Sequence, residues 1–121
     1  MKPMPPKIKQ WVEALRSGHY QQARGRLKRD AGYCCLGVLC DISKLGKWVN
    51  NNNESAYQMK NRCSWQGHLP PEVTAWAGIT PKCSVTYGGD LTGLAKINDK
   101  LAKSFPQIAD LIESQWEELV L

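Results

Sequence analysis

The side chains with the most chemistry to offer lie in Gly32–Asp41, a run that holds three of the five cysteines. The apolar residues after Cys34 and Cys35 predict that a helix begins there, and a helix N-terminus favours the thiolate form of cysteine. A hydrolase would also need a base and a residue that orients it. The candidates for these two roles are His19 or His68, and Asn98 or Asp99.

The order of Cys34 or Cys35, then His68, then Asn98 is that of papain-like enzymes, but the flanking residues match no peptidase signature. A Cys-His hydrolase or transferase with these four residues is therefore an alternative function. The continuous apolarity of the run favours the opposite outcome, in which the thiols are buried and unreactive. We accordingly expect a binding protein more than an enzyme.

A cationic segment precedes the cysteines and is the predicted binding site. Arg24, Arg26 and Lys28 alternate with small or apolar residues, which predicts a strand over residues 20–28 with the three cations on one face. Arg29 follows in a predicted turn. Arginine pairs with phosphate in a bidentate manner, so nucleic acid or nucleotide phosphates could bind here. No phosphate-binding glycine fingerprint accompanies these residues.

The distribution of charge supports a negatively charged partner. Residues 1–62 carry 12 Lys or Arg and 4 Asp or Glu, whereas residues 63–121 carry 4 and 7. The first half therefore has a net charge of +8 and the second of −3. A basic half of this kind can face phosphates or an acidic protein surface.

The cysteines do not indicate a metal or a cofactor. An odd number of cysteines is typical of reduced thiols in the cytoplasm, and a zinc site would be expected to include a C-x₂-C pair, which this chain lacks. We therefore predict no metal and no cofactor. The chain also has no apolar stretch near the length of a membrane span and no apolar segment after its basic N-terminus, so we expect a cytoplasmic protein that contacts no membrane.

The pattern of elements predicts one α+β domain over residues 1–121, with about four helices packed on a small, mostly antiparallel sheet. Helices are expected from Pro5 or Pro6 to Gly18, from Cys34 to about Lys44 with Gly46 as the stop, over 69–78, around 91–97, and after Ser104, which with Gln107 forms a capping box. Further strands are expected around 48–49, 56–59 and 83–87. The four asparagines at 50–53 favour a turn or mobile loop that joins the first two of these strands. The apolar C-terminus, Leu119–Leu121, either docks on the core or contacts a second copy of the chain.

Several blocks of the sequence, taken together, resemble a family of small proteins encoded by tailed phages and prophages. These blocks are Trp11–Gly18, Tyr33–Asp41, Leu69–Val73 with Trp76–Gly78, Leu94–Asp99, and Ser104–Ile112. The resemblance implies a phage-encoded accessory binding protein, such as an inhibitor of a host defence complex that handles nucleic acid or nucleotides. The expected partner is then a host or phage protein complex, and direct binding to nucleic acid is a further alternative.

Overall fold

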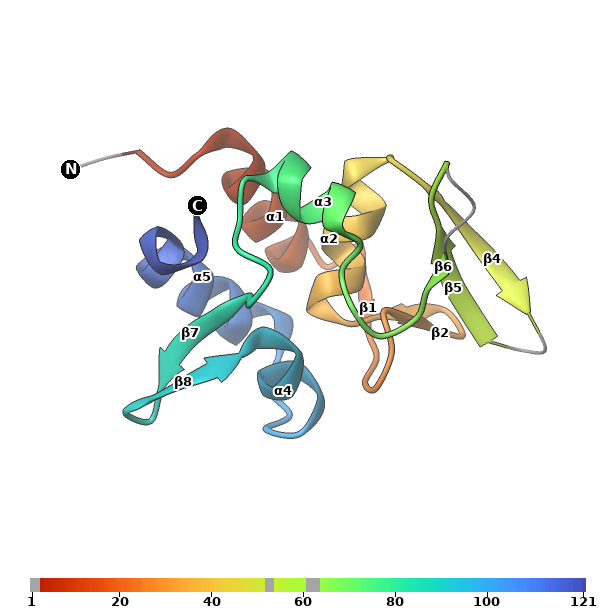
Figure 1. The fold of residues 1–121 in the computed structure, drawn as a ribbon. Coiled ribbons are helices and arrows are strands. Elements are labelled where there is room, and N and C mark those ends of the chain that lie inside the picture. The colour runs from red at the N-terminus through yellow and green to blue at the C-terminus, as the bar shows by residue number, and fades with distance from the viewer. Residues whose placement is uncertain (1–2, 52–53, 61–63) are drawn as a thin grey trace.

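The computed structural model describes residues 3–51, 54–60 and 64–121, and these residues form a small α+β domain, as predicted (Figure 1). The helices are α1 (Pro6–Arg16), α2 (Cys35–Ser43), α3 (Pro71–Ala77), α4 (Leu94–Asp99) and α5 (Phe105–Leu119). The strands are β1 (Gln21–Gln22), β2 (Lys28–Arg29), β3 (Gly32–Tyr33), β4 (Lys47–Asn51), β5 (Glu54–Gln58), β6 (Ser64–Trp65), β7 (Ser84–Tyr87) and β8 (Asp90–Gly93).

Helix α2 is the centre of the fold because its sequence is apolar on all sides. Every residue from Cys35 to Cys40 is buried, and the helix contacts α1, α3, α4 and β3. The indole N–H of Trp11 donates to the carbonyl of Cys35 across 2.9 Å, which joins α1 to the start of α2. The N-terminus of α2 is therefore buried inside the protein.

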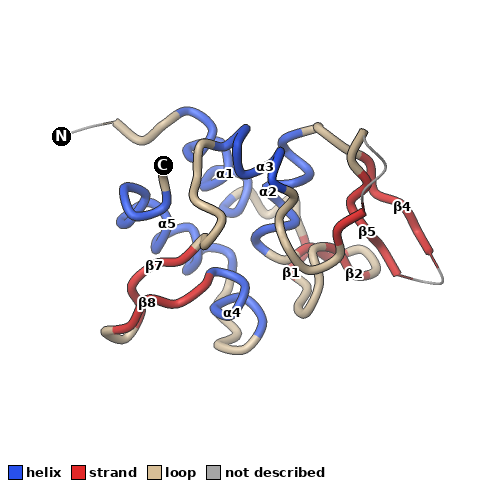
Figure 2. Tube along the Cα trace, viewed as in Figure 1, coloured by secondary structure: helices blue, strands red, loops and turns tan. Residues whose placement is uncertain are grey.

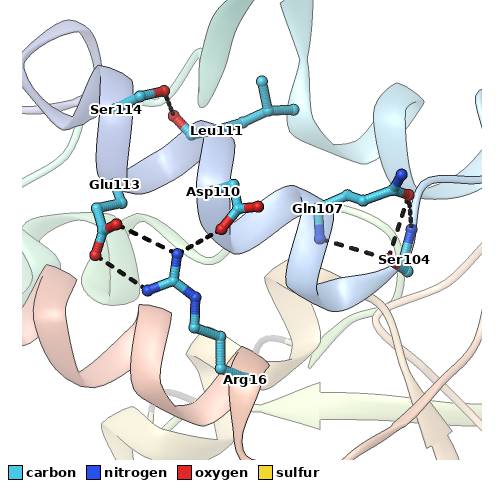
Figure 3. A network of polar contacts seen from close by, with 7 residues as sticks. All are labelled: Arg16, Ser104, Gln107, Asp110, Leu111, Glu113 and Ser114. Atoms are coloured by element: carbon cyan, nitrogen blue, oxygen red, sulfur yellow. Dashed lines mark hydrogen bonds and ion pairs between the residues drawn. The ribbon is translucent and has the colours of Figure 1, made fainter.

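Helices α1 and α5 pack against each other on the far side of α2 from β4 and β5 (Figure 1). The guanidinium of Arg16 on α1 bridges Asp110 at 2.6 Å and Glu113 at 3.0 Å on α5 (Figure 3). All three groups are exposed, so the pairs fix the alignment of the helices more than they stabilise the fold. Ser104 and Gln107 form the predicted capping box at the start of α5 (Figure 3).

The strands form three small sheets in place of the single sheet that was predicted. Their orders are β1-β3-β2, β4-β5-β6 and β7-β8, and every pairing is antiparallel except that of β1 with β3. The β4-β5-β6 sheet lies at one end of the molecule and the β7-β8 hairpin at the other, with helices between them (Figure 2). Part of the predicted asparagine turn, residues 52–53, lies outside the described residues.

The local sequence signals predicted several helices correctly. Helix α1 buries the predicted stripe of Ile8, Trp11, Val12 and Leu15. Helix α3 begins at a proline and ends before Gly78, which adopts the left-handed conformation.

The expected strand over residues 20–28 is wrong. The chain forms β1, bends through residues 24–27 and resumes as β2, because Leu27 turns into the core and is fully buried. Its N–H donates to the carbonyl of Gln66, and its carbonyl accepts from Cys34 N–H at 3.1 Å. These bonds hold Leu27 from both sides, so the three cations cannot share one strand face.

Helix α2 ends at Ser43, and Lys44 caps it in the left-handed conformation with φ of 57°, so the expected end near Lys44 is confirmed. Gly46 does not stop the helix, but a glycine is needed there because a Cβ would collide with the carbonyl oxygen of Gln58. One further boundary differs from the prediction. Leu91 belongs to the exposed strand β8, and the helix expected around it begins only at Leu94.

The C-terminus docks on the protein's own core. Leu119 is fully buried and its carbonyl accepts from Thr80 N–H at 2.7 Å, while Val120 forms a β-bridge with Ile79. Leu121 is 83% exposed. Within the described part of the chain, no helix is long and apolar enough to cross a membrane.

Candidate anion-binding surface

The thiols of Cys34 and Cys35 lie at the N-terminus of α2, as predicted, but they are not activated. Cys34 is the N-cap residue, and its sulfur accepts a hydrogen bond from Gly37 N–H. Burial raises the pKa of Cys34 to about 11, and burial also raises the pKa of Cys35 well above its ordinary value. Loss of water around the sulfur outweighs the helix dipole here, so both residues remain protonated thiols at neutral pH.

Asn98 lies beside these thiols, but its amide is fully used in holding the backbone together. Its oxygen accepts from Cys35 N–H at 3.2 Å and from the Gln22 amide at 2.9 Å. Its nitrogen donates to the carbonyl of Ala23 and to the carboxylate of Asp99, both at 2.8 Å. The side chain is completely buried, and the geometry gives it a structural role in joining β1, α2 and α4.

His68 is exposed and lies at a separate cavity of about 170 Å³, whose lining includes Leu36, Leu94 and Cys83. Among the described residues, His68 has no hydrogen-bond partner, so nothing aligns it with Cys34 or Cys35. Burial raises the pKa of Cys83 to about 11. The structure therefore brings together the predicted cysteines and Asn98. It places His68 at the cavity beside Leu36 and Leu94, without a described hydrogen bond to either thiol.

Two of the four predicted binding residues meet at one cleft. Arg24, beyond the end of β1, and Arg29, on β2, line a cleft of about 330 Å³ together with Gln21, Gln22 and Asp30. Both arginines are exposed. Arg24 donates from Nε to the carbonyl of Asn98 at 3.2 Å, and the guanidinium of Arg29 forms no hydrogen bond or ion pair with any residue that the structure describes. The cleft thus combines one anchored guanidinium with one unpaired guanidinium.

The other two predicted cations are engaged with protein groups. Arg26 donates to the side-chain oxygen of Gln66 at 3.3 Å. The ammonium of Lys28 lies over the rings of Tyr33 and Trp48, at 5.1 and 5.6 Å from their centres. Strand alternation explains the division, since Lys28 pairs with Tyr33 and Arg29 with Gly32 on the opposite face of β2.

A second group of cations was missed by the sequence reasoning. Lys44, Lys47 and Lys60 line an open cavity of about 460 Å³ whose floor includes Leu45 and Met59. Lys60 is distant in sequence from Lys44 and Lys47 and meets them because β4 pairs with β5, with Lys47 opposite Gln58. The available signal was a lysine at each end of a predicted hairpin.

No three Cys, His, Asp or Glu side chains in the described residues come together in a way that could hold a metal ion. The fifth cysteine, Cys63, lies outside the described residues.

A family model described as "Domain of unknown function (DUF8296)" matches residues 4–116. The chain belongs to this family. The match includes Arg24, Arg29, the buried cysteines and Asn98, so the cleft and the polar contacts beneath it are parts of the family domain. No curated protein and no solved structure matches the chain significantly.

Proposed function

We propose that this protein is an accessory binding protein, encoded by a phage, that engages a complex handling nucleic acid or nucleotides in the host cytoplasm and inhibits or redirects it. The observation that carries the proposal is the convergence of Arg24 and Arg29 on one cleft, where no carboxylate among the described residues forms an ion pair with either. Two exposed guanidinium groups at one cleft suit the recognition of phosphate or acidic groups.

The state of the thiols favours binding over catalysis. A cysteine nucleophile needs an accessible thiolate beside a base, whereas Cys34 and Cys35 are buried and protonated, and neither thiol has a hydrogen bond to a histidine that the structure describes. The resemblance to small proteins of tailed phages supports a host target, as does the net positive charge of residues 1–62.

The test is capture of a partner from the lysate of phage-infected bacteria, using the purified tagged protein and nuclease-treated and untreated samples. We expect wild-type protein to retain a complex that acts on nucleic acid or nucleotides, identified by mass spectrometry and by a change in its activity. The R24A/R29A variant should retain much less of that complex. The control variant K9A/K82A removes the same charge from two exposed lysines outside the cleft, and should behave as wild type.

Two results would refute the proposal. Equal recovery of the complex by R24A/R29A and wild type would show that the cleft is not the contact. Recovery that disappears after nuclease treatment would favour the alternative in which the protein binds nucleic acid directly. A homo-oligomer, which remains a prediction, can be detected in the same preparation by its mass in solution.

A further inference from the structure

The Arg24–Arg29 cleft has a mixed lining that narrows the class of ligand it can hold. Besides the two guanidinium groups, the lining carries the carboxylate of Asp30 and the amide side chain of Gln21, both exposed. A carboxylate repels a bare anion, but it is a strong acceptor for hydroxyl groups. The lining therefore suits a molecule that carries phosphate at one end and hydroxyls nearby.

The guanidinium of Arg24 is held in place before any ligand arrives. Its Nε–H is used by the carbonyl of Asn98, and Asn98 is itself fixed by its four side-chain hydrogen bonds. Gln22 on the cleft wall is likewise fixed, since its amide donates to Asn98 and, at 2.7 Å, to the carbonyl of Lys103. Such preorganisation reduces the entropy lost when a ligand binds.

The walls of the cleft also argue against recognition of a nucleobase. The described residues that line it include no aromatic side chain, and the rings of Tyr33 and Trp48 lie beneath Lys28 on the opposite face of β2. Sites that hold bases without sequence preference stack them on aromatic rings. Its volume of about 330 Å³ is near the lower end of the range for small-molecule sites.

From these observations we infer that the cleft binds a sugar-phosphate unit, with the phosphate between Arg24 and Arg29 and a sugar hydroxyl donating to Asp30. The unit can come from a free phosphorylated sugar or nucleotide, or from the backbone of a single RNA strand, which carries a 2′-hydroxyl beside each phosphate. The inference rests on the proposed function for its expectation that the partner complex handles nucleotides, and it names the group that the cleft would contact.

The test is calorimetric titration of the purified protein with four probes: ribose 5-phosphate, ribose, inorganic phosphate and a single-stranded oligouridylate, whose riboses keep their 2′-hydroxyls. We expect ribose 5-phosphate to bind about tenfold more tightly than inorganic phosphate, and ribose alone not to bind. R29A should lower the affinity for ribose 5-phosphate about tenfold or more, as expected for loss of a charge-assisted hydrogen bond. Since the exposed guanidinium of Arg29 forms no hydrogen bond or ion pair with a described residue, this variant should keep the wild-type melting temperature.

The variant D30N separates the two parts of the ligand. It should reduce the preference for ribose 5-phosphate over inorganic phosphate while leaving phosphate binding intact or stronger. Binding of the oligonucleotide alone, with sensitivity to R29A, would assign the unit to a strand backbone. The inference is overturned if no phosphorylated probe binds. It is also overturned if R29A and D30N bind all four probes as tightly as the wild-type protein does. Because these titrations need no partner, their failure is separate from a failure to capture a complex.

Discussion

Replacing Asn98 with alanine should destabilise the protein strongly, although the residue resembles a catalytic group in the sequence. Its side chain is fully buried and forms four hydrogen bonds. Three of these go to the buried backbone N–H of Cys35, the backbone carbonyl of Ala23 and the amide of Gln22. The fourth partner, Asp99, is half-buried and can turn to water.

The magnitude follows from the three bonds that water cannot easily replace. Each contributes about 1 kcal/mol net, and leaving the buried Cys35 N–H without an acceptor costs about 1–2 kcal/mol more. The loss in free energy of unfolding is then about 4 kcal/mol, a large fraction of the roughly 5–15 kcal/mol that stabilises a typical domain. For a domain of this size, the melting temperature should fall by about 15 °C.

The assay is urea unfolding followed by circular dichroism, with Asn50→Ala as the matched control. Asn50 is exposed on β4, so its removal should change the free energy of unfolding by no more than about 0.5 kcal/mol. A loss below about 1 kcal/mol in Asn98→Ala would refute the structural role assigned here from the hydrogen-bond energies. Asn98→Asp should be more harmful at pH 8 than at pH 5, because an ionised carboxylate would face the carbonyl of Ala23 and the carboxylate of Asp99.

Four other predictions test the packing of the domain. Gly37→Ala should cost about 3 kcal/mol or more, because its Cβ would overlap a backbone oxygen, whereas Gly67→Ala, where the Cβ meets open space, should be neutral in a melting experiment. Leu119→Ala should cost about 2–5 kcal/mol and Leu121→Ala almost nothing, which denaturant unfolding can compare. In a Cys63→Ser background the four buried thiols should resist iodoacetamide at pH 8 and react fully in urea; fast labelling of the folded protein would contradict their burial. Because burial raises their pKa in the folded state above the ordinary value of 9.0, the unfolded chain binds fewer protons as the pH rises, so stability should fall from about pH 9 to pH 11.

The parts of the fold that the sequence predicted well are those set by local chemistry. The start of α3 follows from its prolines and its end from Gly78, and the start of α5 follows from the Ser104–Gln107 capping box. The buried stripe of α1 follows from helical spacing alone. Each signal lies within a few residues of the element that it defines, so no knowledge of the tertiary structure was needed.

The break in the cationic segment could not be predicted in this way. Alternating cations and small residues fit a continuous strand, and what decides against it is the burial of Leu27 between Gln66 and the start of α2. Both contacts come from other parts of the chain. The same is true of Asn98. Its place after the cysteines and His68 in the sequence suggested catalysis, whereas its hydrogen-bond partners on β1 and α2 assign it a structural role.

The burial of Leu27 also explains how the candidate site arises. If one continuous strand ran through residues 20–29, Arg24 and Arg29 would lie on opposite faces, since they are five positions apart. The bend at Leu27 reverses this relation and places both arginines at one cleft, while Lys28 is turned away onto Tyr33 and Trp48. The bend in turn requires that α2 approach the backbone of Leu27 closely, which only a glycine at position 37 allows. The apolar, cysteine-rich run therefore contributes to the site by shaping the basic segment beside it, and its thiols need take no part in the chemistry.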